Sequence, residues 1–296
     1  MTWRFKLAPD NTKIDFMSKR FLAFAFSAFL IFGSFGLLGV KGLNFGVDFA
    51  GGTLVEIKTA NVPDLHDLRT TLNSLGLGSI SLQEFGDPHN ILIRMPQQAG
   101  GPEVQARAVE TVKTALTQEF ATGVDYRRVE YVGPQVGDEL KKAGLMALLL
   151  SVVGILIYVA VRFEWPFGVA AVVAFLHDAI GTLGFFALTG WEFDLSTMGA
   201  VLLVAGYSIN DTIVVFDRIR ENLRKYKKMP LAELFNLSTN QMLTRSLMTS
   251  FTTLLALSAL VLFGGEVIRG FTWALIIGIV VGTYSSTYVA AALMLY

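Results

Sequence analysis

Two aspartates and one arginine fall inside or at the edge of apolar stretches of this chain. Asp178 lies about midway along residues 166–188, and Asp211 lies near the end of residues 195–216. Arg245 leads into a third apolar stretch, residues 246–263. A charge at the centre of a bilayer costs about 2.5 to 3.5 kcal/mol even on the most permissive insertion scale. Charges placed at that cost are expected to have a function, and a buried carboxylate near an arginine can load and unload a proton.

Polar side chains recur near these charges at helical spacing. Tyr207, Ser208 and Asp211 are expected on one helix face, and the next span continues from Arg245 with threonines three and four residues apart. The predicted polar track beside the relay is Tyr207, Ser208, Asn210, Thr249, Thr252 and Thr253.

Two interpretations of these residues stay open. In the first, Asp211, Arg245 and Asp178 form a proton relay, in which movement of the arginine changes the proton affinity of a carboxylate. In the second, a static Asp–Arg pair or an Asp–Thr hydrogen bond only holds helices together. Two aspartates, an arginine and a threonine-rich helix in adjacent spans favour the relay. His177 is expected to point about 100° away from Asp178 and to pack, rather than carry protons.

The composition excludes several classes of protein. Of 296 residues, 53% are hydrophobic and 16% are charged, against roughly 25% charged in soluble domains, which indicates a membrane protein. Lysine plus arginine and aspartate plus glutamate both number 24, so the global basicity of a nucleic-acid binder is absent. The chain has no cysteine and three scattered histidines, and we therefore expect no cofactor and no metal site.

Hydropathy predicts an α-helical polytopic membrane protein with six transmembrane helices. The spans are residues 21–40, 143–161, 166–188, 195–216, 246–263 and 268–296. The first is too long for a signal-peptide core and is expected to remain as an anchor. Lysines and arginines cluster in residues 1–20 and again after the fourth span, which predicts both termini in the cytoplasm, a cytoplasmic loop at 217–244, and residues 41–140 outside. Residues 141–296 form the five-helix remainder of the bundle.

The external segment predicts one small domain. Strands are expected at 53–59, 80–85, 91–95 and 124–132, with helices at 64–75 and 102–120 and a turn at 86–90. The order β-α-β-β-α-β is that of a ferredoxin-like sandwich. It contains no nucleotide loop, no paired-carboxylate site and no nucleophile elbow, so we expect binding or mechanical work and not an enzyme.

Two packing features complete the predictions. Close-packed helix faces are expected at the two glycine groups, and an amphipathic helix that lies on the inner surface and leads into the fifth span is expected over residues 231–243. The glycines are Gly33, Gly36 and Gly39 in the first span and Gly278 and Gly282 in the last.

Several motifs resemble the SecF family of the SecD–SecF protein-export complex, over essentially the whole chain. They are residues 45–53, with Gly51-Gly52; residues 132–137; the long segment 207–222, with Asn210-Asp211-Thr212; and residues 245–253, which open with Arg245. In contrast to the family pattern, the chain ends at Tyr296 in an apolar run without a charged tail, which leads us to expect a trimmed terminus or further residues that close the sixth span.

The resemblance implies an RND-type bundle that pairs with SecD and an external domain that helps to handle unfolded preprotein. It implies proton-coupled roles for Asp211 and Arg245, whereas Asp178 matches only a His-Asp feature of the third span. The implied partners are SecD, the SecYEG channel with accessory Sec subunits, preprotein, protons and the lipid bilayer, in the bacterial inner membrane, without nucleic acid. Two alternatives remain: half of an RND-type exporter of lipids or small molecules, and a passive scaffold of the Sec channel.

Overall fold

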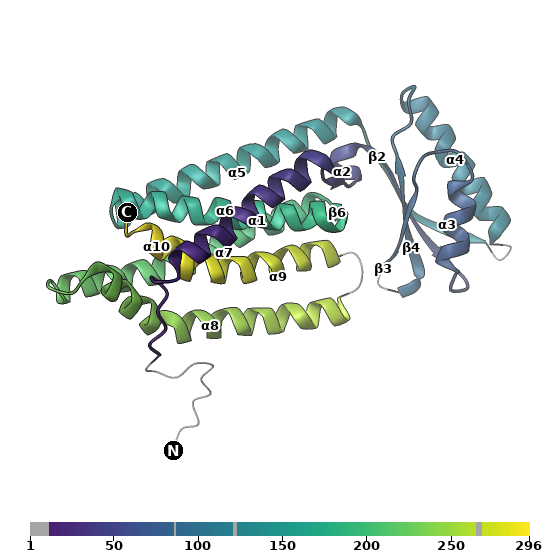
Figure 1. Cartoon of the computed structure of the whole chain (residues 1–296). Helices are drawn as coiled ribbons and strands as arrows, with labels where there is room; N and C mark the ends of the chain where they lie inside the picture. Colours follow the sequence, from purple (N-terminus) through teal and green to yellow (C-terminus); the bar gives the residue numbers. More distant parts are fainter. Residues whose placement is uncertain (1–11, 86, 121–122, 265–267) are drawn as a thin grey trace, which may run out of the picture.

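The computed structural model describes residues 12–85, 87–120, 123–264 and 268–296, and combines a helical bundle with a small sheet domain at one end (Figure 1). Six helices in this part of the chain are long and apolar enough to cross a membrane. They are α1 (Arg20–Val40), α5 (Pro134–Arg162), α6 (Trp165–Thr189), α7 (Leu195–Lys225), α8 (Leu231–Phe263) and α9 (Arg269–Tyr284), the last continued by η1 (Ser285–Ala290) and α10 (Ala291–Leu293).

The sheet domain follows α1 and has the predicted element order. It contains β2 (Gly52–Thr59), α3 (Leu65–Asn73), β3 (Ser81–Phe85), β4 (Asp87–Pro96), α4 (Pro102–Glu119) and β5 (Val124–Val132). The four strands form an antiparallel sheet in the order β3-β4-β2-β5. Both helices cover one face of this sheet, where alternate strand residues such as Val55, Ile57 and Ile93 are buried. The ferredoxin-like prediction is confirmed.

Non-covalent contacts join the sheet domain to the bundle, in addition to the two chain connections. After α1, the short strand β1 (Asn44–Phe45) pairs in parallel with β6 (Glu192–Phe193), which lies between α6 and α7. The short helix α2 (Val47–Ala50) follows, and the Asp48 carboxylate accepts a hydrogen bond from the Leu195 N–H at the start of α7 (3.0 Å). Arg94 of β4 forms an ion pair with Glu192. These contacts hold the sheet domain against the connection between α6 and α7.

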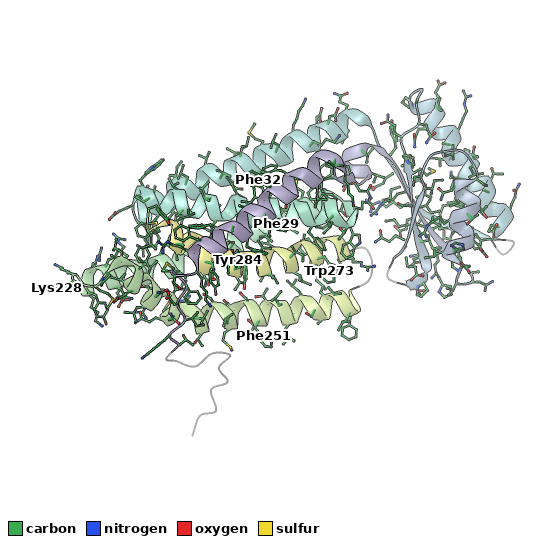
Figure 2. The ribbon with its side chains drawn as sticks, viewed as in Figure 1. Phe29, Phe32, Lys228, Phe251, Trp273 and Tyr284 are labelled. Carbon is green, nitrogen blue, oxygen red and sulfur yellow. The ribbon has the colours of Figure 1, made fainter. Side chains whose placement is uncertain are left out.

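The bundle has an inner and an outer set of helices. Most of α6 and α9 and half of α7 are buried, whereas α1, α5 and α8 are largely exposed. The helix ends follow ordinary rules: Asp194 caps α7 by accepting from the Thr197 N–H (2.7 Å), and Gly190 ends α6 with a φ of 69°. Exposed phenylalanines, including Phe29 and Phe32, cover the outward face of α1, as Figure 2 shows. Such a surface suits lipid or another apolar helix.

The segment between the fourth and fifth spans, predicted as a cytoplasmic loop at 217–244, is mostly helical, because α7 continues to Lys225 and α8 begins at Leu231. The helix predicted over residues 231–243 forms the first turns of α8 and leads into the fifth span, and its Leu234 and Phe235 are buried in the bundle. Asn222 of α7 donates to Ser238 of α8 (2.8 Å), which stabilises this helical hairpin.

Two smaller predictions differ from the structure. The helix predicted at 64–75 ends at Asn73, and the turn predicted at 86–90 is shorter, because β4 begins at Asp87; Gly86 lies outside the described residues. The predicted cytoplasmic segment 1–20 is described only from Thr12 onward.

The glycine prediction was right for α9 and wrong for α1. A Cβ at Gly278 would collide with Val204, whereas a Cβ at Gly33, Gly36 or Gly39 would meet no atom within 4 Å. Instead, Gly181 and Gly184 of α6 allow α1 to approach.

Candidate proton-relay site

Two carboxylates lie in the buried interior of the bundle, on neighbouring helices. Asp178 of α6 is fully buried, and Asp211 of α7 is 9% exposed. Both are therefore in the position that the hydropathy pattern predicts. What the sequence did not indicate is the set of hydroxyl groups that surrounds them.

Asp211 is held by two serines from two other helices. Ser246 of α8 donates to Oδ1 at 2.5 Å, and Ser286 of η1 donates to Oδ2 at 2.6 Å. Both serine side chains are fully buried. Hydrogen bonds to an ionised carboxylate are stronger than neutral ones, so the two serines together stabilise a charge that the membrane interior disfavours.

Asp178 also accepts hydrogen bonds from two serines, and in addition it contacts a histidine. Ser208 of α7 and Ser285 of η1 both donate to Oδ2, at 2.5 and 2.8 Å. Gly282 allows this approach, since a Cβ there would lie 3.2 Å from the Ser208 Oγ and 3.4 Å from the carboxylate.

His177 contacts Asp178, which corrects the prediction that it points away. Its Nδ1 lies 2.9 Å from Oδ1 of Asp178, and both side chains are buried. The helical rotation of 100° between neighbours is overcome by the length of the two side chains. Nε2 of His177 is buried and has no hydrogen-bond partner among the described residues. The imidazole is therefore part of the carboxylate cluster and not only a packing residue.

The last span positions one serine on each carboxylate because its helix changes winding there. Residues 285–290 form a π-helical turn directly after α9. Tyr284 precedes this turn and fastens it to α1: its hydroxyl donates to the Ala23 carbonyl at 2.8 Å and lies 3.1 Å from the Ser27 Oγ (Figure 2). π-Turns inside α-helices frequently occur at functional sites.

Arg245 is not part of this cluster in the structure. Among the described residues it forms no ion pair with Asp211; it lines an open cavity of about 380 Å³ between α5, α7 and α8, together with Tyr158, Asp217 and Glu221. Arg245 and Ser246 are neighbours in the sequence, so the helix that turns Ser246 toward Asp211 turns Arg245 to the exposed side.

The residues of the predicted polar track are likewise divided between the buried interior and the exposed faces of the helices. Ser208 is buried but bonds Asp178 rather than Asp211, and Tyr207 is half-buried with its hydroxyl 3.5 Å from the Thr253 Oγ. Asn210, Thr249 and Thr252 are exposed on the outer faces of α7 and α8. The hydroxyls of Thr249 and Thr252 donate to carbonyls of their own helix. These threonines do not line a path to Asp211 in this conformation.

The carboxylates of this arrangement can bind protons. The described residues contain no group of three histidine, cysteine or acidic side chains that could hold a metal ion. Each carboxylate has hydroxyl donors that also accept hydrogen bonds, so protonation of a carboxylate requires one of its serine hydroxyls to rotate. The residues missed by sequence reasoning are Ser246, Ser285 and Ser286.

Comparisons with solved structures give the same architecture over the whole chain. The crystal structure of SecDF from Thermus thermophilus, described as a translocon-associated membrane protein, matches with a TM-score of 0.81 and 37% sequence identity, covering 98% of this chain and 39% of that chain. A crystal structure of SecDF in the super-membrane-facing form matches with a TM-score of 0.72 at the same identity and coverage. This chain thus spans about two fifths of those longer chains.

The sequence comparisons agree with the structural ones. Proteins named protein translocase subunit SecF from Rickettsia felis and Rickettsia bellii are each 44% identical over 98% of this chain, which covers 93% and 95% of their lengths. The model of the SecD/SecF GG motif matches residues 36–61, around Gly51 and Gly52. The model of the protein export membrane protein SecD/SecF, C-terminal, matches residues 111–296. This chain belongs to the SecD/SecF family of protein export membrane proteins.

Proposed function

We propose that this chain is the SecF-type subunit of the Sec protein-export machinery and that, together with SecD, it uses the proton motive force to promote preprotein translocation. Asp211 is the proton-carrying group. Arg245 adjusts its charge state when the two approach each other, and Asp178 with His177 forms a second protonatable cluster. SecYEG with its accessory subunits and an unfolded preprotein are the further partners.

The observation that carries this proposal is the buried Asp211 carboxylate, bound by hydroxyl groups from two other spans. Asp211 joins α7, α8 and η1 at a single titratable group. Its charge state therefore bears on the packing of three helices. One proton that falls through 100 mV supplies about 2.3 kcal/mol, which changes a conformational equilibrium about fiftyfold.

The exposed polar residues at membrane depth support a second bundle as partner. Asn210 of α7 and Arg245 of α8 are exposed, and both lie in predicted membrane-spanning helices. Exposed to lipid, these groups would be costly, so another protein's polar groups are expected to cover them. A SecD bundle at the face formed by α5, α7 and α8 would do so, and would make the relay a shared site.

The orientation follows from charge. Lys227, Lys228 and their basic neighbours lie beyond the inner end of α7, at the end of the bundle opposite the sheet domain; Figure 2 labels Lys228 there. Because basic loops stay in the cytoplasm, this end faces inward in the bacterial inner membrane, with both termini, and the sheet domain faces outward.

Translocation into membrane vesicles tests the proposal. Vesicles with the full chain and SecD are compared for wild type, Asp211→Asn and Arg245→Met, with and without a proton gradient. The matched control is Asp138→Asn on α5, since Asp138 is exposed and pairs with Lys141 at 3.2 Å, away from the buried cluster and from the cavity that Arg245 lines. We expect both relay variants to assemble with SecD and to lose the gradient-dependent part of translocation, while Asp138→Asn retains it.

Other outcomes separate the alternatives. Full gradient dependence in Asp211→Asn would show that the carboxylate is structural and would favour a passive scaffold. An exporter of lipids or small molecules would show gradient-driven movement of such a substrate in vesicles that lack preprotein, with the same loss in Asp211→Asn. No gradient effect on preprotein in wild type would contradict the proposal directly.

A further inference from the structure

The sheet domain has two edge strands among the described residues, β3 and β5, of which β3 borders the bundle. The strand order β3-β4-β2-β5 places β3 at an edge, and among the described residues β3 pairs only with β4. An edge strand presents a row of backbone N–H and C=O groups that can pair with another extended chain. Natural proteins usually cover such an edge or protect it with charges.

A cleft of about 260 Å³ runs beside this edge, between the sheet domain and the outer end of the bundle. Ser81, Leu82 and Gln83 of β3 all border it. Successive side chains of a strand point to opposite faces, and the Leu82 side chain is buried in the domain core. Ser81 and Gln83 lie on the same sheet face as Arg94 of β4, which also lines the cleft, so the cleft lies against this face of the edge strand β3.

The opposite wall comes from the bundle. Trp191 and Glu192 of the α6–α7 connection and Arg269 at the start of α9 form it. The Arg269 guanidinium lies over the Trp191 ring, 5.1 Å from its centroid, and Glu192 pairs with Arg94 of β4. The wall thus offers an aromatic surface and charges of both signs, with no preference for an acidic or a basic ligand.

We propose that the β3 edge and this cleft bind an extended segment of unfolded polypeptide by strand addition, so that the segment becomes a fifth strand beside β3. Backbone hydrogen bonds would supply the affinity, as in other cases of β-augmentation. Recognition of this kind is largely independent of sequence, which suits a site that meets many different chains. The proposal rests on the proposed function, because that function places the sheet domain on the outer face, where a translocating chain emerges.

Disulfide cross-linking tests this site, since the chain has no native cysteine. Gln83→Cys places one thiol on β3 at the cleft, and Thr111→Cys places the control thiol on the exposed surface of α4. Ser81→Cys, on the same face as Arg94, provides a second position in case Gln83→Cys does not fold. Each variant of the full chain is assembled with cysteine-free SecD in vesicles.

The probe is a secretory preprotein stalled during translocation by a folded domain fused to its carboxyl end. Its single cysteine is moved one residue at a time through a ten-residue window. Strand addition predicts cross-links to Cys at position 83 that are several-fold stronger than at position 111 and that alternate with every second probe position. Cross-links no stronger than those at position 111, uniform along the window, or formed with the β3 edge of a second copy would overturn the proposal.

Failure of this site and failure of the proposed function are distinguishable in the same vesicles. If a proton gradient stimulates translocation but position 83 does not cross-link, only the strand-addition site is wrong. If position 83 cross-links with alternation and the gradient has no effect, the site stands and the proton-driven function is wrong.

Discussion

Ser285 and Ser286 are consecutive residues, yet each donates a hydrogen bond to a different buried carboxylate. Ser285 binds Asp178 of α6 at 2.8 Å, and Ser286 binds Asp211 of α7 at 2.6 Å. One turn of η1 therefore lies between the two acidic groups of the bundle. A change of charge at either aspartate acts on the same short stretch of backbone.

The stretch that carries both serines is wound as a π-helix. π-Helical turns are rare and have less favourable geometry than α-helix, so they persist where surrounding contacts require them. Here the hydroxyl oxygens of Ser285 and Ser286 also lie 3.1 and 3.2 Å from the carbonyl oxygens of Gly282 and Thr283, one turn back. Each hydroxyl therefore has a local acceptor available when its carboxylate no longer accepts the hydrogen bond.

The first prediction concerns Ser286. Ser286→Ala removes one of two hydroxyl donors from Asp211, and a hydrogen bond to a charged group contributes about 1.5 to 3 kcal/mol. We expect the gradient-dependent part of translocation to fall about tenfold, the equivalent of 1.4 kcal/mol. The measurement is translocation into vesicles with and without a proton gradient.

Ser27→Ala is the matched control for that variant. Ser27 is a buried serine of α1 whose hydroxyl contacts Tyr284 and neither carboxylate. We expect Ser27→Ala to leave the gradient dependence of translocation unchanged. Equal loss in both variants would mean that Ser286 acts through packing of the last span and not through Asp211.

The second prediction concerns Gly52, the first residue of β2. Its φ is 142°, a conformation open in practice only to glycine, and a Cβ there would collide with the Met95 carbonyl oxygen across the sheet. Gly52→Ala should destabilise the sheet domain by about 1 to 3 kcal/mol from backbone strain alone. Limited proteolysis of the full chain should detect this as faster cleavage of the domain.

Gly76→Ala tests the effect of backbone strain in the absence of a steric collision. Gly76 has a φ of 72°, and a Cβ there would meet no atom within 4 Å. We expect its effect to be the smaller of the two, and the opposite order would show that the close approach to Met95 is not what requires glycine at position 52.

The sequence predicted the two carboxylates but not their partners, for a physical reason. An acidic residue in an apolar run is costly, so Asp178 and Asp211 stand out in hydropathy. A serine in such a run is common and usually bonds a carbonyl of its own helix, so Ser246, Ser285 and Ser286 carry no signal by themselves. Arg245 was expected near Asp211 because both lie in adjacent spans, yet a rotation of 100° between residues 245 and 246 decides which of them faces inward. The rotation of a helix depends on tertiary packing, as does the π-turn.

The third prediction concerns the pH dependence of the junction. Burial raises the pKa of the Glu192 carboxyl above its ordinary value of 4.5; Arg94 opposes this effect, and the neighbouring carboxylates of Asp194 and Asp48 add to it. The folded state then binds this proton more tightly than the unfolded state does. The contribution of Glu192 to the free energy of unfolding is therefore full below pH 4.5 and is lost as the pH rises through the folded pKa.

The measurement is thermal unfolding of the purified full chain over a pH series that begins well below 3.8, the ordinary pKa of an aspartate, and rises past the ordinary pKa of 4.5 of Glu192. Relative to Glu192→Gln, wild type should lose stability as the pH rises. Asp87→Asn should show the opposite trend. Hydrogen bonding from the His89 backbone N–H lowers the pKa of Asp87. The stability of wild type relative to this variant should therefore increase as the pH rises from acid. A constant difference between wild type and Glu192→Gln at every pH would contradict the assigned direction.

The fourth prediction concerns orientation. Lys228 and Thr111 are both exposed, at opposite ends of the molecule, and the absence of native cysteine makes each replacement the unique thiol of the chain. In intact cells with a permeabilised outer barrier, a membrane-impermeant maleimide should label Thr111→Cys and should leave Lys228→Cys unlabelled until the inner membrane is opened. The reason is that the basic segment 224–228 resists transfer across the membrane, whereas a sheet domain of mixed charge is translocated readily. Labelling of Lys228→Cys before the inner membrane is opened would reverse the orientation, and it would also remove the β3 edge from the side on which an exported chain emerges.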